Sequence, residues 1–175
     1  MQGTLELPEG TFLIRIASLS DIKQITEIYN QGIQDRIATL ETNTKSVEEM
    51  IAWLKNRSSR HKVLVLEDAE KRIKGWASLN VFNARECYKG VADLSIYINR
   101  EERNKKLGKH LLLALIQVAK EEEFYKMVLT TLAVNRTGHK LYYALGFTKV
   151  GTYVKQGMLD GKWIDVHVME KFLLD

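Results

Sequence analysis

A short basic run holds the residues of this chain that are best suited to chemistry. Positions 100–110 read Arg-Glu-Glu-Arg-Asn-Lys-Lys-Leu-Gly-Lys-His, with five Lys or Arg side chains against two Glu. The run stands between a predicted strand that ends at Ile98 and a predicted helix that begins near Leu107. The start of a helix leaves backbone N–H groups without partners and carries the positive end of the helix dipole, which favours a phosphate group. A basic turn that only faces solvent is the alternative, and charge alone does not decide.

Other phosphate-binding and catalytic motifs are missing from the sequence. It contains no G-x-x-x-x-G-K-S/T, no G-x-G-x-x-G and no G-x-S-x-G, which excludes a P-loop, a Rossmann-type loop and a nucleophile elbow. The four histidines are scattered without the spacing of metal ligands, so we expect no metal. Cys87 is the only cysteine, so the chain cannot form an internal disulfide.

Length and composition are those of an ordinary globular chain. It has 175 residues, of which 45% are hydrophobic and 27% charged, and its net charge is +4. No apolar run approaches the roughly 20 residues that cross a bilayer, and the N-terminus lacks a signal-peptide pattern. We therefore expect a cytoplasmic protein with no membrane partner. Residues 1–10 are predicted to be a flexible leader, and residues 11–175 a single domain.

Hydrophobic periodicity predicts a mixture of strands and helices. Helices are predicted at 20–33, 46–54, 107–122 and 135–145, and the second of these opens with the capping box Ser46-Val-Glu-Glu49. Strands are predicted at 11–17, 62–67, 75–82, 91–98, 127–132, 147–153 and 163–172. The order indicates an α+β fold in which three central strands pair through hairpins and a strand–helix–strand unit follows.

Two motifs resemble those of the GNAT N-acetyltransferases. Arg103-Asn-Lys-Lys-Leu-Gly108 is similar to the family's acetyl-CoA loop, Q/R-x-x-G-x-G/A, with Lys106 at the position of the first glycine. The second motif begins at Asn135 and continues through Tyr142 to Leu-Gly146-Phe147. Other residues between Leu13 and Lys171 resemble the phosphinothricin acetyltransferase branch. The resemblance implies the GNAT fold, with a mixed, mostly antiparallel sheet flanked by helices, acetyl-CoA as co-substrate, and a homodimer.

The resemblance also implies which residues hold acetyl-CoA. Backbone N–H groups of the loop would bind the pyrophosphate, and the strand edge at 96–98 would pair with the pantetheine amides and polarise the thioester carbonyl. The residues in these roles are Ile96, Tyr97, Ile98, Arg103, Asn104, Lys105, Lys106, Leu107, Gly108, Lys109 and Asn135.

Acetyl transfer to an amine needs a base and an acid. Alkylamines are mostly protonated at pH 7, and the leaving thiolate must gain a proton. Asp93, where the branch usually has Glu, is the candidate base, and Tyr142 is the candidate acid. The alternatives are that Asp93 caps a hairpin or pairs with a cation, and that Tyr142 packs on a helix face, as is also expected of the neighbouring Tyr143.

The remaining candidates concern the acceptor substrate. Arg85 and Tyr88 would bind a substrate carboxylate, because Arg offers a two-pronged donor, although a solvated loop cation is the alternative for Arg85. We predict an N-acetyltransferase for a small amino-acid-like amine such as phosphinothricin or methionine sulfoximine. Acetylation of a protein N-terminus or a polyamine and a non-catalytic acyl-CoA-binding sensor are the alternatives. Basic and acidic residues interleave outside 100–110, so we expect no nucleic-acid partner. The three tryptophans, Trp53, Trp76 and Trp163, are expected in the core or an interface.

Overall fold

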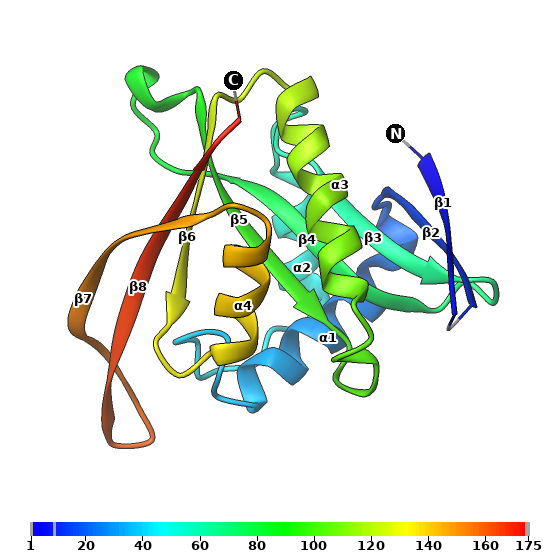
Figure 1. Cartoon of the computed structure of the whole chain (residues 1–175). Helices are drawn as coiled ribbons and strands as arrows, with labels where there is room; N and C mark the ends of the chain where they lie inside the picture. The colour runs from blue at the N-terminus through cyan, green and yellow to red at the C-terminus, as the bar shows by residue number, and fades with distance from the viewer. Residues whose placement is uncertain (1, 9, 174–175) are drawn as a thin grey trace.

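One sheet of eight strands runs through the computed structural model, which describes residues 2–8 and 10–173 (Figure 1). The strands follow the order β1-β2-β3-β4-β5-β6-β8-β7, and neighbours are antiparallel except for β5 and β6, which are parallel. This confirms the α+β class and the mixed, mostly antiparallel sheet. The strand bounds are Gln2–Leu7 (β1), Gly10–Ile16 (β2), Val63–Asp68 (β3), Ile73–Val81 (β4), Val91–Ile98 (β5), Lys126–Leu132 (β6), Thr148–Leu159 (β7) and Lys162–Phe172 (β8).

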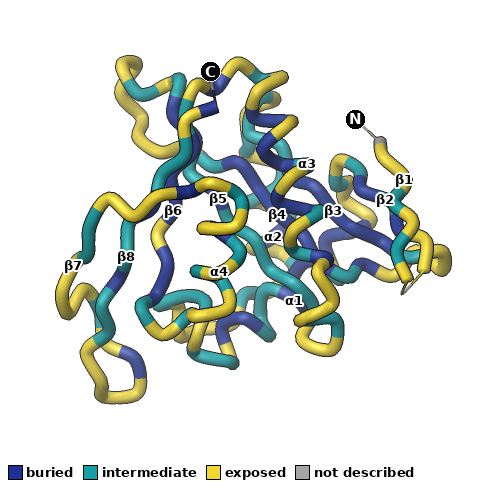
Figure 2. Tube along the Cα trace, viewed as in Figure 1, coloured by how far each residue is buried: buried dark blue, intermediate teal, exposed yellow. Residues whose placement is uncertain are grey.

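Four α-helices cover the two faces of this sheet. Alternation along β3 shows how: Val63 and Val65 pack in one cluster with α1 and α2, and Leu64 and Leu66 pack in another with α3. The central strands are therefore buried from both sides, whereas β7 is largely exposed (Figure 2). In the described residues no helix is long and apolar enough to cross a membrane. The helix bounds are Ile22–Gln34 (α1), Val47–Lys55 (α2), Leu107–Glu121 (α3) and Arg136–Ala144 (α4).

Local sequence signals place two of the helix starts. The capping box of α2 is present, since the Ser46 N–H donates to the Glu49 carboxylate at 2.7 Å and the Glu49 N–H donates to Ser46 Oγ at 3.1 Å. At α4 the Asn135 side chain accepts from the Gly138 N–H at 3.0 Å. The helix stops before Gly146, whose φ of +81° suits a residue without Cβ.

The N-terminal segment corrects the sequence-based prediction. Residues 2–7 form β1, which pairs with β2 from Gln2↔Arg15 to Leu7↔Gly10, and Leu5 and Leu7 pack against the main core. The prediction of a flexible leader is therefore wrong for these residues, while residues 1 and 9 lie outside the described part. The hairpin satisfies backbone groups and buries two leucines, and both gains offset the entropy lost on ordering the segment.

The two parallel strands separate after a short stretch of pairing. Pairing between β5 and β6 runs only from Val91↔Lys126 to Asp93↔Val128. Beyond this point residues 94–97 of β5 and 130–132 of β6 line a cavity of about 340 Å³. Asp93 therefore stands at the point where the sheet opens.

Candidate active site

The opening between β5 and β6 brings the two candidate catalytic residues together. The side chains of alternate β5 residues point to opposite faces, with Asp93 on the face covered by α1 and α2. Tyr142 comes from α4 on the other face, yet both residues line the 340 Å³ cavity. A gap that passes through the sheet thus places a carboxyl group and a phenol beside the same space.

Asp93 has the environment of a general base. Its carboxylate accepts hydrogen bonds from Asn80 Nδ2 at 3.2 Å and from the backbone N–H of Leu94. Burial raises the pKa of Asp93 to about 6, and these two hydrogen bonds oppose the rise only in part. Among the described residues no cation pairs with this carboxylate directly. A carboxylate with such a pKa is largely ionised at pH 7 and accepts a proton more readily than an exposed one.

Tyr142 has the environment of a neutral donor. Only 7% of its surface is exposed, and its ring packs edge-on against Phe147 at 6.0 Å between centroids. Burial, together with the negative charge of Asp93, raises the pKa of Tyr142 to about 12. The phenol therefore keeps its proton over the physiological pH range. Tyr143 is 54% exposed instead, which separates the two neighbouring tyrosines.

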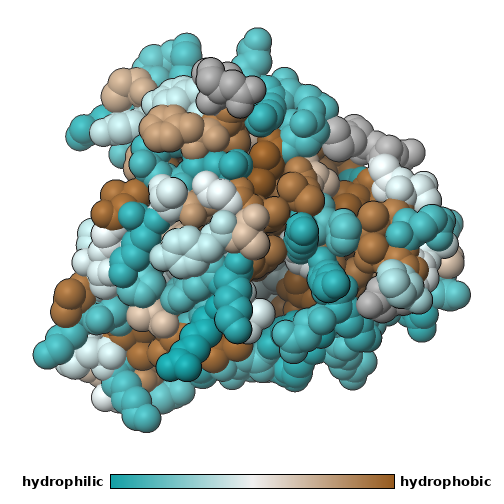
Figure 3. Space-filling view, in the orientation of Figure 1, coloured by the Kyte–Doolittle hydropathy of each residue, from teal (hydrophilic) through white to brown (hydrophobic). Residues whose placement is uncertain are grey.

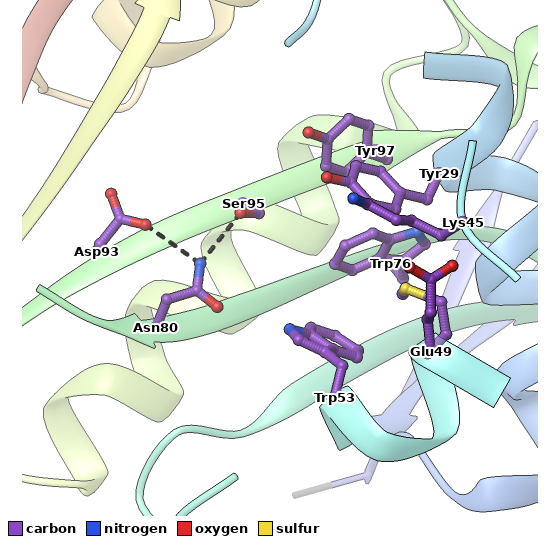
Figure 4. A pocket seen from close by; sticks show the side chains of 10 residues that line it. Tyr29, Lys45, Glu49, Trp53, Trp76, Asn80, Asp93, Ser95 and Tyr97 are labelled. Atoms are coloured by element: carbon purple, nitrogen blue, oxygen red, sulfur yellow. Dashed lines mark hydrogen bonds between the residues drawn. The ribbon is translucent and has the colours of Figure 1, made fainter. Parts of the chain in front are cut away.

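A second cavity, of about 510 Å³, adjoins the first along β4 and β5 (Figure 4). Cross-strand pairs line its floor: Trp76 faces Tyr97, and Asn80 faces Asp93. The Trp76 and Tyr97 rings stack at 5.0 Å between centroids, and Trp53 meets Trp76 edge-on at 5.6 Å. The cavity therefore has an aromatic end and a polar end. Tyr29, Asp93, Ser95 and Tyr97 line both cavities.

The sequence does not identify the aromatic end of the larger cavity as part of the site. The sequence predicts Trp53, Trp76 and Trp163 in the core or an interface, and Trp76 is indeed 2% exposed, but Trp53 and Trp76 also line the larger cavity. The Trp76 indole N–H has no hydrogen-bond partner among the described residues. The sequence does carry one signal of a site on this strand. Polar residues such as Ser78 and Asn80 stand at every second position of an otherwise apolar strand.

The loop at 99–106 uses much of its positive charge internally. Arg100 and Arg103 pair with Asp35 at 2.7 and 2.6 Å, and Lys105 pairs with Glu102 at 2.8 Å. These ion pairs fix the loop against α1 and within itself. The formal surplus of the basic run is therefore not all directed at a ligand.

The start of α3 nevertheless retains the features of an anion site. In the described chain no side chain caps this helix, and Lys106 at its N-cap has a left-handed φ of 61°. Residues with a side chain rarely adopt this backbone conformation, which glycine tolerates best. A Cβ at Gly108 would lie 3.5 Å from Leu141, an ordinary contact, so packing within the protein does not demand glycine there.

The two candidate substrate ligands lie elsewhere. Arg85 and Tyr88 belong to the loop between β4 and β5, where Tyr88 packs edge-on against Phe82 and Arg85 is exposed. Neither residue lines the two cavities that meet at Asp93. The chain itself therefore does not bring them to the candidate catalytic pair.

Comparison with known proteins decides the family. Residues 14–168 match the model of the acetyltransferase (GNAT) domain. The chain belongs to the GNAT acetyltransferase family. This acetyltransferase is 29% identical over 158 residues to the L-methionine sulfoximine/L-methionine sulfone acetyltransferase of Pseudomonas aeruginosa, which covers 90% of the chain and 92% of that protein. It is therefore an acetyl-CoA-dependent N-acetyltransferase similar to the phosphinothricin and methionine sulfoximine branch.

Solved structures agree with this placement. A GNAT superfamily phosphinothricin acetyltransferase from Sinorhizobium meliloti, in complex with AcCoA, aligns with a TM-score of 0.87 and 28% identity, over 91% of this chain and 86% of that one. A ribosomal-protein-alanine N-acetyltransferase from Brucella melitensis aligns with a TM-score of 0.86 and 29% identity, over 91% and 98%. Both structures therefore share the fold of this chain over 91% of its length.

Proposed function

We propose that this acetyltransferase transfers the acetyl group of acetyl-CoA to the amine of a small amino acid of the phosphinothricin or methionine sulfoximine kind. The observation that carries the proposal is the position of Asp93, a half-buried carboxylate at the end of the β5–β6 pairing, where two cavities meet. The names of the Pseudomonas and Sinorhizobium relatives supply the substrate class.

The residues of the opening fit acetyl-CoA. The β5 edge from Leu94 to Ile98 is unpaired toward β6, so its backbone groups are available to an extended amide chain. The uncapped start of α3 offers N–H groups to a pyrophosphate, with Lys106 and Lys109 beside it. When bound, acetyl-CoA supplies the acetyl group as a thioester. The proposed contacts are Ile96, Tyr97, Ile98, Arg103, Asn104, Lys105, Lys106, Leu107, Gly108, Lys109 and Asn135.

Asp93 and Tyr142 divide the proton transfers between them. Asp93 accepts the proton of the substrate ammonium, directly or through one water, so that the amine becomes a nucleophile. Tyr142, which stays protonated, gives its proton to the leaving sulfur. It regains a proton, directly or through water, from the attacking nitrogen, which loses its second proton as the amide forms, and Asp93 returns the first proton to solvent. The two groups suit opposite roles because the surroundings hold one ionised and the other neutral at pH 7.

The larger cavity is proposed to take the substrate side chain. Its aromatic end offers apolar, polarisable surface to the substrate side chain. Arg85 and Tyr88 remain proposed ligands of the substrate carboxylate. Because their loop lies away from both cavities, that role requires the loop to move or a second copy of the chain to supply it.

A homodimer is also proposed, from the surface of the last two strands. Large apolar side chains are exposed along the β7–β8 hairpin, among them Val154 at 70% and Trp163 at 57%, and brown patches mark this region in Figure 3. β7 is also an edge strand. Exposed apolar surface beside an open edge is typical of an interface between chains. Light scattering should give twice the chain mass, and a Val154→Lys variant should run as a monomer.

A protein N-terminus is the second candidate acceptor, because of the likeness to the ribosomal-protein-alanine N-acetyltransferase. The test is a thiol-release assay with acetyl-CoA and a panel of amines: amino acids with sulfoximine, sulfone or phosphinate groups, polyamines, and short peptides beginning with alanine. The proposal requires the highest kcat/KM for a small amino acid. A preference for peptides would replace it, and acetyl-CoA binding without release by any amine would indicate a sensor.

A further inference from the structure

Arg57 is a half-buried cation whose hydrogen-bond acceptors are all uncharged in the described residues. It follows α2, and its guanidinium donates to the carbonyl of His61 at 2.9 Å, to the carbonyl of Leu79, and to Asn80 Oδ1 at 3.0 Å. It also lies 4.5 Å above the Trp53 ring. Burial lowers the pKa of Arg57 to about 10, which leaves it charged at neutral pH. Taking a charge even partly out of water is costly unless the charge is well hydrogen-bonded, so this arrangement calls for an explanation.

The guanidinium fixes the direction of the Asn80 amide. Asn80 Oδ1 accepts from Arg57 and from Ser78 Oγ at 2.9 Å, while Asn80 Nδ2 donates to Asp93 at 3.2 Å and to Ser95 Oγ at 3.0 Å (Figure 4). Arg can only donate, and an ionised Asp can only accept. Turning the amide over would set donor against donor at Arg57 and acceptor against acceptor at Asp93. The serine hydroxyls adapt to either direction, so the two charged ends decide it.

The other ionisable groups around Asp93 do not take over this task. Each lines one or both of the cavities or pairs with a neighbour on the same face of the sheet, and none is hydrogen-bonded to Asp93 in the described chain: Tyr29, Glu41, Lys45, Glu49, Tyr97, Tyr142, Lys126 and Glu170. Asn80 is thus the side chain through which a positive charge reaches the carboxylate.

We propose that Arg57 and Asn80 are positioning residues, which hold the Asp93 carboxylate ionised and oriented at the cavity through an amide whose direction Arg57 fixes. The proposal rests on the proposed role of Asp93 as the base. A direct ion pair with Arg57 would stabilise the carboxylate so strongly that it would lose its basicity. The interposed amide transmits a weaker, neutral hydrogen bond, which keeps the carboxylate ionised at neutral pH but still able to accept a proton.

The pH dependence of kcat/KM tests the role of Asn80. In Asn80→Ala the ionised form loses a hydrogen bond, so the acid limb of the profile should move up by about one pH unit. The ionised fraction of Asp93 at pH 6 then falls about fivefold, whereas at pH 9 it is unchanged. Ser78→Ala is the matched control, because it removes a neutral donor to the same Oδ1 and leaves Arg57 in place. Its acid limb should stay where it is in the wild type.

The double variant tests whether Arg57 acts through Asn80. Arg57→Met should move the acid limb in the same direction by a smaller amount, and Arg57→Lys, which keeps a cationic donor, should restore it. Because the effect passes through the amide, Arg57→Met in the Asn80→Ala background should add no further shift. A further shift there would mean that the charge of Arg57 acts on Asp93 through space. That result would overturn the relay, that is, the proposed action of Arg57 on Asp93 through the Asn80 amide.

A direct titration keeps the relay separate from the proposed function. The Asp93 carboxyl carbon can be followed by ¹³C NMR against pH in the wild type and in Asn80→Ala, with Asp93→Asn to assign the signal. An upward shift of the Asp93 titration in Asn80→Ala supports the relay even if no amine is acetylated. An Asp93 titration that does not move in Asn80→Ala, or a rate that falls equally at every pH, overturns the relay. If the Arg57 variants do not fold, the Asn80→Ala variant alone decides.

Discussion

Replacing Asp93 by Asn is expected to stabilise the fold while it removes the base. Burial raises the pKa of Asp93 from 3.8 to about 6. The folded state therefore holds this proton more tightly than the unfolded state, so the stability is fully present below pH 4 and falls as pH rises to about 6. A difference of about two units corresponds to roughly 3 kcal/mol of unfolding free energy at pH 7. An amide of the same shape carries no such cost.

Urea unfolding followed by tryptophan fluorescence between pH 4 and pH 8 measures this effect. The gain in unfolding free energy of Asp93→Asn over the wild type should grow from near zero at pH 4 to at most about 3 kcal/mol at pH 7.

Asp35→Asn is the control, and its effect on the free energy of unfolding should have the opposite sign. Burial would raise the pKa of Asp35, but hydrogen bonds from Arg100 and Arg103 hold it below its usual value. That variant should be less stable than the wild type at pH 7, and the gap should close as pH falls. An Asp93→Asn variant that gains no stability at pH 7, or gains as much at pH 4, would show that burial does not raise the pKa of Asp93.

Three further substitutions probe the site and its supports. Tyr142→Phe should lower kcat on the order of a hundredfold with no change in acetyl-CoA affinity by calorimetry; an unaffected kcat would remove Tyr142 from the mechanism. Lys106→Gly should raise the free energy of unfolding by up to about 1 kcal/mol, because it relieves the left-handed φ of 61°, and a loss of stability would contradict the strain. Gly32→Ala places a Cβ 2.8 Å from the Tyr97 ring, so it should cost roughly 1–3 kcal/mol in urea unfolding, and a neutral effect would show that the ring yields freely.

Periodicity and local capping predicted most of the architecture. The capping box at Ser46 and the Asn135 cap fix helix starts by hydrogen bonds within four residues, so sequence alone reveals them. The sequence does not predict β1, because the stability of this strand comes from pairing with β2 and from packing two leucines against the main core. A segment of this kind has no local signal strong enough to distinguish it from a loop.

The site was predictable only in part, for a similar reason. Asp93 and Tyr142 lie on recognisable elements, and their types suit acid–base chemistry. The contacts of Arg57 with Asn80 join residues 23 positions apart, and their meaning depends on which way an amide points. In the sequence, all five positive charges of the basic run are available to a phosphate. In the structure, two of them pair with Asp35 at the C-terminal end of α1. Long-range pairing decides such cases, and one sequence does not contain it.

The proposed activity is the acetylation of a small amino acid in the opening beside Asp93. The most direct measurement is the initial rate of CoA thiol release from acetyl-CoA with L-methionine sulfoximine as acceptor, with mass spectrometry of the product. We expect release that depends on the amine, a product acetylated on nitrogen, and a large loss of rate in Asp93→Asn, which still binds acetyl-CoA. Equal rates for Asp93→Asn and the wild type would contradict the role of Asp93, and acetyl-CoA binding with no release for any amine of the panel would contradict the proposed activity.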